Sequence, residues 1–220
     1  MIHKRMLPEQ IANQLRRDIL RGRLPAGSSL KERESAAEMG VSRTPMREAI
    51  RILAKEGLVT LRPSRSPLVA DPDIKEVSDQ VVVLVALEQL SAKLACLNAT
   101  SADLDRVSKI SDHMAEHFDT TDPLDMFEID MSFHTAIAQA SRNEALTRTH
   151  GAYLARLWRV RYLAAIQRRS RERVVRQHEL IVHALRRRDV EAAVDGITNH
   201  LKYLGEDIET AMHDARAVQA

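Results

Sequence analysis

Cysteine, aromatic residues and long apolar runs are all scarce in this sequence of 220 residues. The single cysteine, Cys96, excludes an internal disulfide, and the chain starts with no apolar leader, so we expect a cytoplasmic protein. The longest apolar run, residues 81–87, is about a third of the roughly 20 residues that a membrane-spanning helix needs. We therefore expect no membrane segment, and interpret that run as buried helix or subunit interface.

Aromatic residues make up only 3% of the chain, whereas apolar residues together make up 44%. Because alanine, leucine, arginine and glutamate are abundant, this composition favours helices over strands. The length exceeds that of a usual single domain. The sequence thus predicts a mainly α-helical protein with two domains.

The net charge of +2 conceals a difference between the two ends of the chain. Residues 1–70 contain 14 Lys and Arg against 7 Asp and Glu, whereas residues 71–220 contain 19 against 24. Clustered cations gain affinity for nucleic acid by releasing counterions from its phosphates, so we expect the N-terminal part to meet this partner. A solvated basic surface is the alternative interpretation of the charge alone.

The first 70 residues carry the pattern of three helices and two short strands. The predicted helices are 8–21, 31–39 and 42–56, and the predicted strands are 58–61 and 67–70. Gly40 is placed to end the second helix, and Ser42 is placed to cap the third. This order predicts a winged helix-turn-helix over 1–70, whose second motif helix enters the major groove of DNA.

The first turn of the predicted reading helix presents Arg43, Thr44 and Arg47. Arginine can form paired hydrogen bonds with O6 and N7 of guanine, which is the commonest specific base contact. The two arginines are four residues apart and share one face of the helix. The alternative is that they are solvated or pair with Glu34 and Glu48.

The stretch LPEQIANQLRRDILRGRLPAGSSLKERESAAEMGVSRTPMREAIRILAKEGLVTLRPSRSPLVA resembles the DNA-binding domain of the GntR family, with GVSRTPMREAI at 40–50 as its core signature. The resemblance implies base contacts by Arg43 and Arg47. It also implies phosphate or groove-edge contacts by Arg33, Ser42 and Thr44, and minor-groove contact by Ser64 and Arg65 of the wing. The family usually has glycine where Ser66 stands, so we expect a less tight wing tip.

The rest of the chain reads as an all-α domain, 74–220, that follows a linker at 71–73. Its six predicted helices span 74–98, 101–118, 122–140, 143–167, 170–187 and 189–213. The breaks between them fall at residues with turn or capping chemistry. We therefore predict a six-helix bundle.

Four side chains of this domain have the types and spacing of a metal site. Asp130 and His134 are four residues apart on one predicted helix, and His178 and His200 lie on two others. One oxygen and three imidazole nitrogens can hold Zn²⁺, Ni²⁺ or a similar divalent ion. Each histidine alone is more often an ordinary core or surface residue, so the spacing by itself supports only a hypothesis.

Residues 74–213 are similar to the FCD domain of the FadR subfamily, through DMSFHTAIAQASRNEAL at 130–146, RQHELIVHALRRRDVEAA at 176–193 and NHL at 199–201. The resemblance implies that Asp130, His134, His178 and His200 bind a divalent metal ion, and that a small carboxylate effector binds beside it. Six helices favour the VanR-like group. Many relatives have arginine where Leu84 stands, so an anion clamp must come from elsewhere.

Three arginines beside Trp158 are candidates for that clamp, although a solvated or salt-bridged face is the simpler interpretation of this arginine-rich stretch. They are Arg156, Arg159 and Arg161.

A further apolar series alternates steps of four and three, as in a helix that packs along another. It consists of Val83, Leu87, Leu90, Leu94 and Leu97. The series could form a dimer interface or the domain core, and core is the simpler interpretation. A homodimer is expected in either case, because one reading helix covers few base pairs and symmetric operators are matched by two-fold proteins.

The sequence therefore predicts a transcription repressor that is not an enzyme, and that binds operator DNA and a small organic acid. Two alternatives stay open: a regulator for which the metal ion itself is the signal, and a metal-dependent hydrolase attached to a DNA-binding domain.

Overall fold

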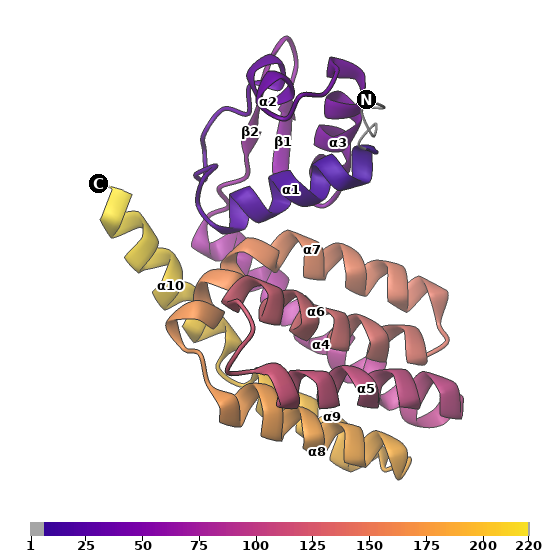
Figure 1. The fold of residues 1–220 in the computed structure, drawn as a ribbon. Coiled ribbons are helices and arrows are strands. Elements are labelled where there is room, and N and C mark those ends of the chain that lie inside the picture. The colour runs from indigo at the N-terminus through magenta and orange to yellow at the C-terminus, as the bar shows by residue number, and fades with distance from the viewer. Residues whose placement is uncertain (1–6, 220) are drawn as a thin grey trace. The chain divides into compact units, whose positions relative to one another are not determined.

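The computed structural model describes residues 7–219, and these form two compact units, one ending at Asp73 and one starting at Ile74 (Figure 1). The N-terminal unit contains α1 (Pro8–Leu20), α2 (Glu32–Glu38), α3 (Arg43–Lys55), β1 (Val59–Arg62) and β2 (Arg65–Val69). Each helix lies within two residues of its predicted bounds. The order of elements is that of a winged helix-turn-helix.

The apolar faces of α1 and α3 form the core of this unit, in which Ile11, Leu15 and Met46 are fully or almost fully buried. Gly40 has a φ of 64°, a left-handed conformation that suits glycine and turns the chain between α2 and α3. Ser42 occupies the cap position of α3 with extended backbone, but its side chain makes no capping hydrogen bond. The predicted cap position of Ser42 is therefore confirmed, although its hydroxyl does not accept from the first turn of α3.

The wing is an antiparallel hairpin in which Val59 pairs with Val69 and Arg62 with Arg65. Its turn places Ser64 at a φ of 53°, in the left-handed region, whereas Ser66 lies inside β2. The position that demands backbone freedom is therefore Ser64. Ser66 needs no left-handed backbone.

The C-terminal unit is entirely helical in its described part (Figure 1). It comprises α4 (Ile74–Asn98), α5 (Ser101–His117), α6 (Pro123–Ala140), α7 (Glu144–Gln167), the π-helical turn η1 (Glu172–Arg176), α8 (Gln177–Arg186), α9 (Val190–Leu201) and α10 (Leu204–Gln219). Helix α4 packs against α6, α7 and α9, while α8 packs against α5 and α9. These contacts bring α6, α8 and α9 around one interior region.

The all-α architecture is confirmed, but the number of helices differs from the prediction. The segment expected as one helix over 189–213 is divided between α9 and α10 at Lys202 and Tyr203. Lys202 keeps helical angles, φ −50° and ψ −42°, and neither residue is proline or glycine, so no local signal marks the division. The described part of this unit thus has seven α-helices, and the count of six that favoured the VanR-like group is wrong.

Helix α4 is unusual in being apolar on more than one face. It is long and apolar enough to cross a membrane by length and composition, yet 39% of its most apolar window is buried in the bundle, and core helices pass the same test. Val77, Val81 and Leu84 face the core, whereas Leu90 and Leu97 are 42% and 62% exposed. The domain-core interpretation of the predicted apolar series is therefore wrong.

Candidate functional site

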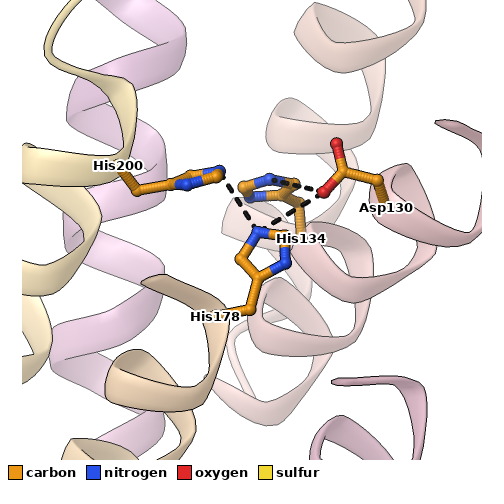
Figure 2. Close-up of side chains that lie close together, drawn as sticks. All are labelled: Asp130, His134, His178 and His200. Carbon is orange, nitrogen blue, oxygen red and sulfur yellow. Dashed lines mark hydrogen bonds and ion pairs between the residues drawn. The ribbon is translucent and has the colours of Figure 1, made fainter. Parts of the chain in front are cut away.

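The structure brings Asp130, His134, His178 and His200 together, as Figure 2 shows. One possible ligand atom from each residue lies within 4.8 Å of the other three. Nε2 of His178 is 3.2 Å from Nε2 of His200 and 3.4 Å from Oδ1 of Asp130. Metal–nitrogen bonds of about 2.1 Å in a tetrahedral arrangement separate the ligand atoms by about 3.4 Å, so these spacings suit a shared cation.

Hydrogen bonds behind the cluster hold two of the rings in the tautomer that a metal requires. His134 donates from Nδ1 to Oε2 of Glu88 at 3.1 Å, and His200 donates from Nδ1 to the side-chain oxygen of Gln177 at 3.1 Å. Both rings therefore keep a lone pair on Nε2, which is the atom that faces the cluster. Oδ1 of Asp130 and Nε2 of His134 are buried with no hydrogen-bond partner among the described residues. The residues thus fit a divalent ion.

Burial keeps two histidines of the cluster, His178 and His200, neutral. It lowers the pKa of His178 to about 4, and burial together with the neighbouring His178 lowers the pKa of His200 well below its usual value. Neutral imidazole is the form that binds metal ions. The cluster can therefore accept a cation at neutral pH without first releasing protons from these two rings.

Glu88 links the cluster to a fourth histidine, His150. Its carboxylate is fully buried and accepts from His134 and, at 2.9 Å, from Nε2 of His150. Burial alone would raise the pKa of Glu88, but His134 and His150 hold that pKa well below its usual value. The buried carboxylate of Glu88 orients the His134 ring. It also joins α4 to α6 through His134 and to α7 through His150.

Close packing of α8 and α9 sets the distance between His178 and His200. A Cβ atom added to Gly196 would lie 3.0 Å from Cγ1 of Ile181, so the two helices approach closely because glycine has no side chain. His200 follows Gly196 by four residues and His178 precedes Ile181 by three, which places each histidine about one turn from this contact.

A cavity of about 180 Å³ adjoins the cluster. Asp130 and His200 line it, together with Arg161, Arg173 and an apolar wall that includes Phe127. The Arg161 side chain is one of few buried charged groups in the described part of the chain, at 5% exposure, and its Nη1 has no hydrogen-bond partner there. Burial lowers the pKa of this guanidinium, while the charges of Glu88 and Asp130 raise it. For Arg161 the solvated-face interpretation is wrong.

All seven side chains predicted to contact DNA are exposed on the N-terminal unit: Arg33, Ser42, Arg43, Thr44, Arg47, Ser64 and Arg65. Arg43 and Arg47 both bind the carboxylate of Glu32, rather than Glu34 or Glu48 as considered from the sequence. The exposure permits the predicted contacts, which remain predictions.

Comparison with known proteins identifies both units. Residues 7–69 match the family described as bacterial regulatory proteins, gntR family, and residues 79–203 match the FCD domain. The HTH-type transcriptional repressor RspR of Escherichia coli (strain K12) is 30% identical over 200 residues, which cover 91% of this chain and 88% of that protein. The chain belongs to the GntR family.

Two further comparisons cover most of this GntR chain. The Nta operon transcriptional regulator of Aminobacter aminovorans is 27% identical over 178 residues, covering 80% of this chain and 82% of that protein. A structure from Rhodococcus sp. RHA1, described as a GntR transcriptional regulator, shares the fold with a TM-score of 0.74 at 23% identity, covering 93% of this chain and 98% of that one. The protein is thus a DNA-binding transcription regulator and not an enzyme, which overturns the hydrolase alternative.

Sequence reasoning missed three functional candidates in this GntR chain. Glu32, Glu88 and His150 act through partners 11 to 62 residues away, and no local spacing reveals such pairs. Arg161 was named but judged solvated. No local signal distinguishes it, because Arg156 and Arg159 on the same helix also have apolar neighbours.

Proposed function

We propose that this GntR protein is a cytoplasmic, homodimeric repressor whose affinity for operator DNA changes when a small carboxylate binds in the cavity beside Asp130 and His200. A divalent ion held by Asp130, His134, His178 and His200 would supply open coordination positions to that carboxylate, since several such ions accept five or six ligands. The presence of a transcriptional repressor among the relatives supports the role of repressor.

The observation that carries the proposal is the buried guanidinium of Arg161. A buried cation with an unpaired donor is expensive unless an anion joins it, and this one lines the same cavity as two of the four candidate metal ligands. Arginine binds carboxylates through paired, charge-assisted hydrogen bonds. Arg161 therefore supplies the anion clamp that the sequence lacks at Leu84.

DNA recognition in this proposal uses α3 as the reading helix, with Arg43 and Arg47 on bases, Arg33, Ser42 and Thr44 on the backbone or groove edge, and Ser64 and Arg65 of the wing in the minor groove. The exposure of all seven side chains supports it. The exposed apolar face of α4 supports a second copy of the chain as its partner, because its residues repeat in the steps of a helix–helix seam.

The effector is tested by a thermal-shift screen of organic and sugar acids against metal-loaded protein, since a ligand of the folded state raises its stability. We expect one class of acids to raise the melting temperature of the wild type and not of Arg161→Met. Arg156→Met is the matched control, because Arg156 stacks on Tyr153 and does not line the cavity. Equal shifts in all three proteins would remove Arg161 from the site.

A second candidate function, control by the metal ion alone, is favoured by the quality of the four-residue cluster. Measurements of DNA affinity distinguish control by an acid from control by the metal ion alone. They use a duplex that the full-length protein has selected in vitro from random sequence. If an acid is the signal, DNA affinity must change when the acid is added to metal-loaded protein. If the metal ion is the signal, DNA affinity must change when Zn²⁺ or Ni²⁺ is added to metal-free protein in the absence of any acid.

A further inference from the structure

The carboxylate of Glu32 holds both arginines of the reading helix. Oε2 of Glu32 accepts from Nε of Arg47 at 3.1 Å, and Oε1 accepts from Nη2 of Arg47 at 3.0 Å. Oε1 also accepts from Nε of Arg43 at 3.2 Å. One side chain of α2 therefore joins two side chains that lie one turn apart on α3.

The carboxylate is the more enclosed member of this group. The Glu32 side chain is 20% exposed, whereas those of Arg43 and Arg47 are 66% and 53% exposed. The arginines hold the pKa of Glu32 below its usual value, so it is an anion at neutral pH. Exposed ion pairs contribute little to folding stability, so stability does not explain this arrangement.

The hydrogen-bond pattern leaves the base-reading edge of each arginine available. Arg47 uses Nε and one hydrogen of Nη2, which form the side of its guanidinium, and Arg43 uses only Nε. A guanidinium has five N–H donors, so Nη1 and the outer hydrogen of Nη2 remain on its far end. Those are the two donors that an end-on contact with guanine O6 and N7 requires.

We propose that Glu32 is a specificity-determining positioning residue, which aims Arg43 and Arg47 at base edges and prevents them from binding backbone phosphates freely. Two mechanisms act together. Holding each guanidinium before DNA arrives removes rotamer freedom that binding would otherwise have to remove. The negative charge also offsets part of the attraction to phosphates, which is the term that gives affinity for any sequence. The proposal rests on the DNA-reading role proposed above for α3.

The experiment compares Glu32→Gln with Glu34→Gln in the full-length protein. Both variants remove one negative charge from α2, but Glu34 pairs only with Lys31 in the described structure, so the general effect of charge is shared. Fluorescence anisotropy at several KCl concentrations measures affinity for the selected duplex and for a scrambled duplex. We expect Glu32→Gln to lower the ratio of the two affinities about tenfold and Glu34→Gln to change it less than about twofold.

Glu32→Asp separates position from charge, because it keeps the anion but withdraws it by one methylene from both guanidiniums. We expect the affinity ratio to fall in this variant as well. Glu32→Asp also tests the proposal if Glu32→Gln does not fold. In an Arg47→Ala background, the effect of Glu32→Gln should shrink, since only Arg43 is left to position.

The proposal would be overturned if Glu32→Gln and Glu34→Gln gave equal affinity ratios. It would also be overturned if Glu32→Gln gave the higher ratio, because Glu32 would then compete with DNA for the arginines. If Arg43→Ala and Arg47→Ala also leave the ratio unchanged, the assignment of the reading helix has failed. If those two variants lower the ratio and Glu32→Gln does not, only the role of Glu32 has failed.

Discussion

At the scale of single residues, Glu88 shows that the candidate metal site depends on side chains that support its ligands. Its carboxylate accepts hydrogen bonds from His134 and His150, so it fixes the orientation and tautomer of His134 without being one of the four candidate ligands. The same scale includes Arg43 and Arg47 of α3, whose donors are proposed to read bases.

Glu88→Gln should weaken divalent-metal binding about 10- to 100-fold, because glutamine has a single acceptor atom for two N–H donors and no charge to support His134. Competition titration against a chromogenic chelator measures the change. Glu144→Gln is the control, since this exposed residue pairs only with Arg148 in the described structure. Unchanged metal affinity in Glu88→Gln would remove its positioning role.

Arg43→Ala and Arg47→Ala should each cost about 1–3 kcal/mol of binding free energy at the matched base, and should relax preference there. Arg33→Ala should instead weaken selected and scrambled duplexes alike, since a phosphate contact carries no sequence information. Gel-shift titration with duplexes that vary one base pair at a time distinguishes the two patterns. Base preferences that stay intact in both reading-helix variants would contradict the assignment.

At the scale of elements, the distance between helices α8 and α9 decides whether His178 and His200 can share an ion. Gly196 permits their close approach, because any side chain there meets Ile181. The π-helical turn η1 lies immediately before Gln177 and His178, and such turns are frequent at functional sites.

Gly196→Ala should lower metal affinity and cost about 1–3 kcal/mol of unfolding free energy, because the new methyl group presses on Ile181 and moves α8 from α9. Gly151→Ala is the control on α7, where an added Cβ meets no atom within 4 Å. That control should gain up to about 1 kcal/mol from helix propensity and leave metal affinity unchanged. Chelator competition and urea unfolding measure the two effects. Wild-type metal affinity in Gly196→Ala would show that the helix spacing does not limit the site.

At the scale of the whole molecule, the proposed metal site and the proposed DNA contacts lie in different units. The candidate metal ligands all lie after Ile74, and the side chains proposed to read DNA all lie before Asp73. A second copy of the chain is needed to present two reading helices to a symmetric operator.

Leu90→Glu should convert the dimer to a monomer, because a charge on the exposed apolar face of α4 cannot be buried against a second copy without a partner. Leu180→Glu is the control, since Leu180 is also exposed, at 60%, but lies on α8. Light scattering gives the mass of each protein. A dimeric Leu90→Glu protein would place the interface elsewhere, and a monomeric wild type would contradict the dimer itself.

Removing the metal with a chelator should lower the melting temperature of the C-terminal unit by roughly 5–10 °C, if the ion is present at about 100 times its dissociation constant. The unfolding transition of the N-terminal unit should not move, because it has no ligand in the cluster. Differential scanning calorimetry resolves the two transitions.

The controls for this prediction are two histidine variants. His134→Ala should abolish the shift on chelation, whereas His183→Ala, which changes an exposed histidine of α8, should retain it. A shift that survives in His134→Ala, or elemental analysis that finds no metal in protein purified without chelators and none after adding Zn²⁺ or Ni²⁺, would refute the site.

The sequence by itself determined the features whose signals are local. Apolar residues three and four apart place one face of each helix in a core, and Gly40 ends α2 because few other residues accept its left-handed backbone. The family signature at 40–50 predicted the reading helix, and the four candidate metal ligands followed from residue type, spacing and resemblance; both assignments stay predictions. The helix faces and the turn at Gly40 each depend on residues within a few turns of one another, whereas the four metal candidates, spread over 130–200, rest on resemblance as well as spacing.

Only the tertiary structure decided the features that depend on distant residues. It showed that Arg161 is buried in the wall of a cavity, that Glu32 binds Arg43 and Arg47, and that Glu88 supports His134. It also divided α9 from α10 and left Leu90 exposed on α4. The physical reason is that periodicity shows which residues share a helix face, whereas burial and pairing depend on which other helix, if any, packs against that face.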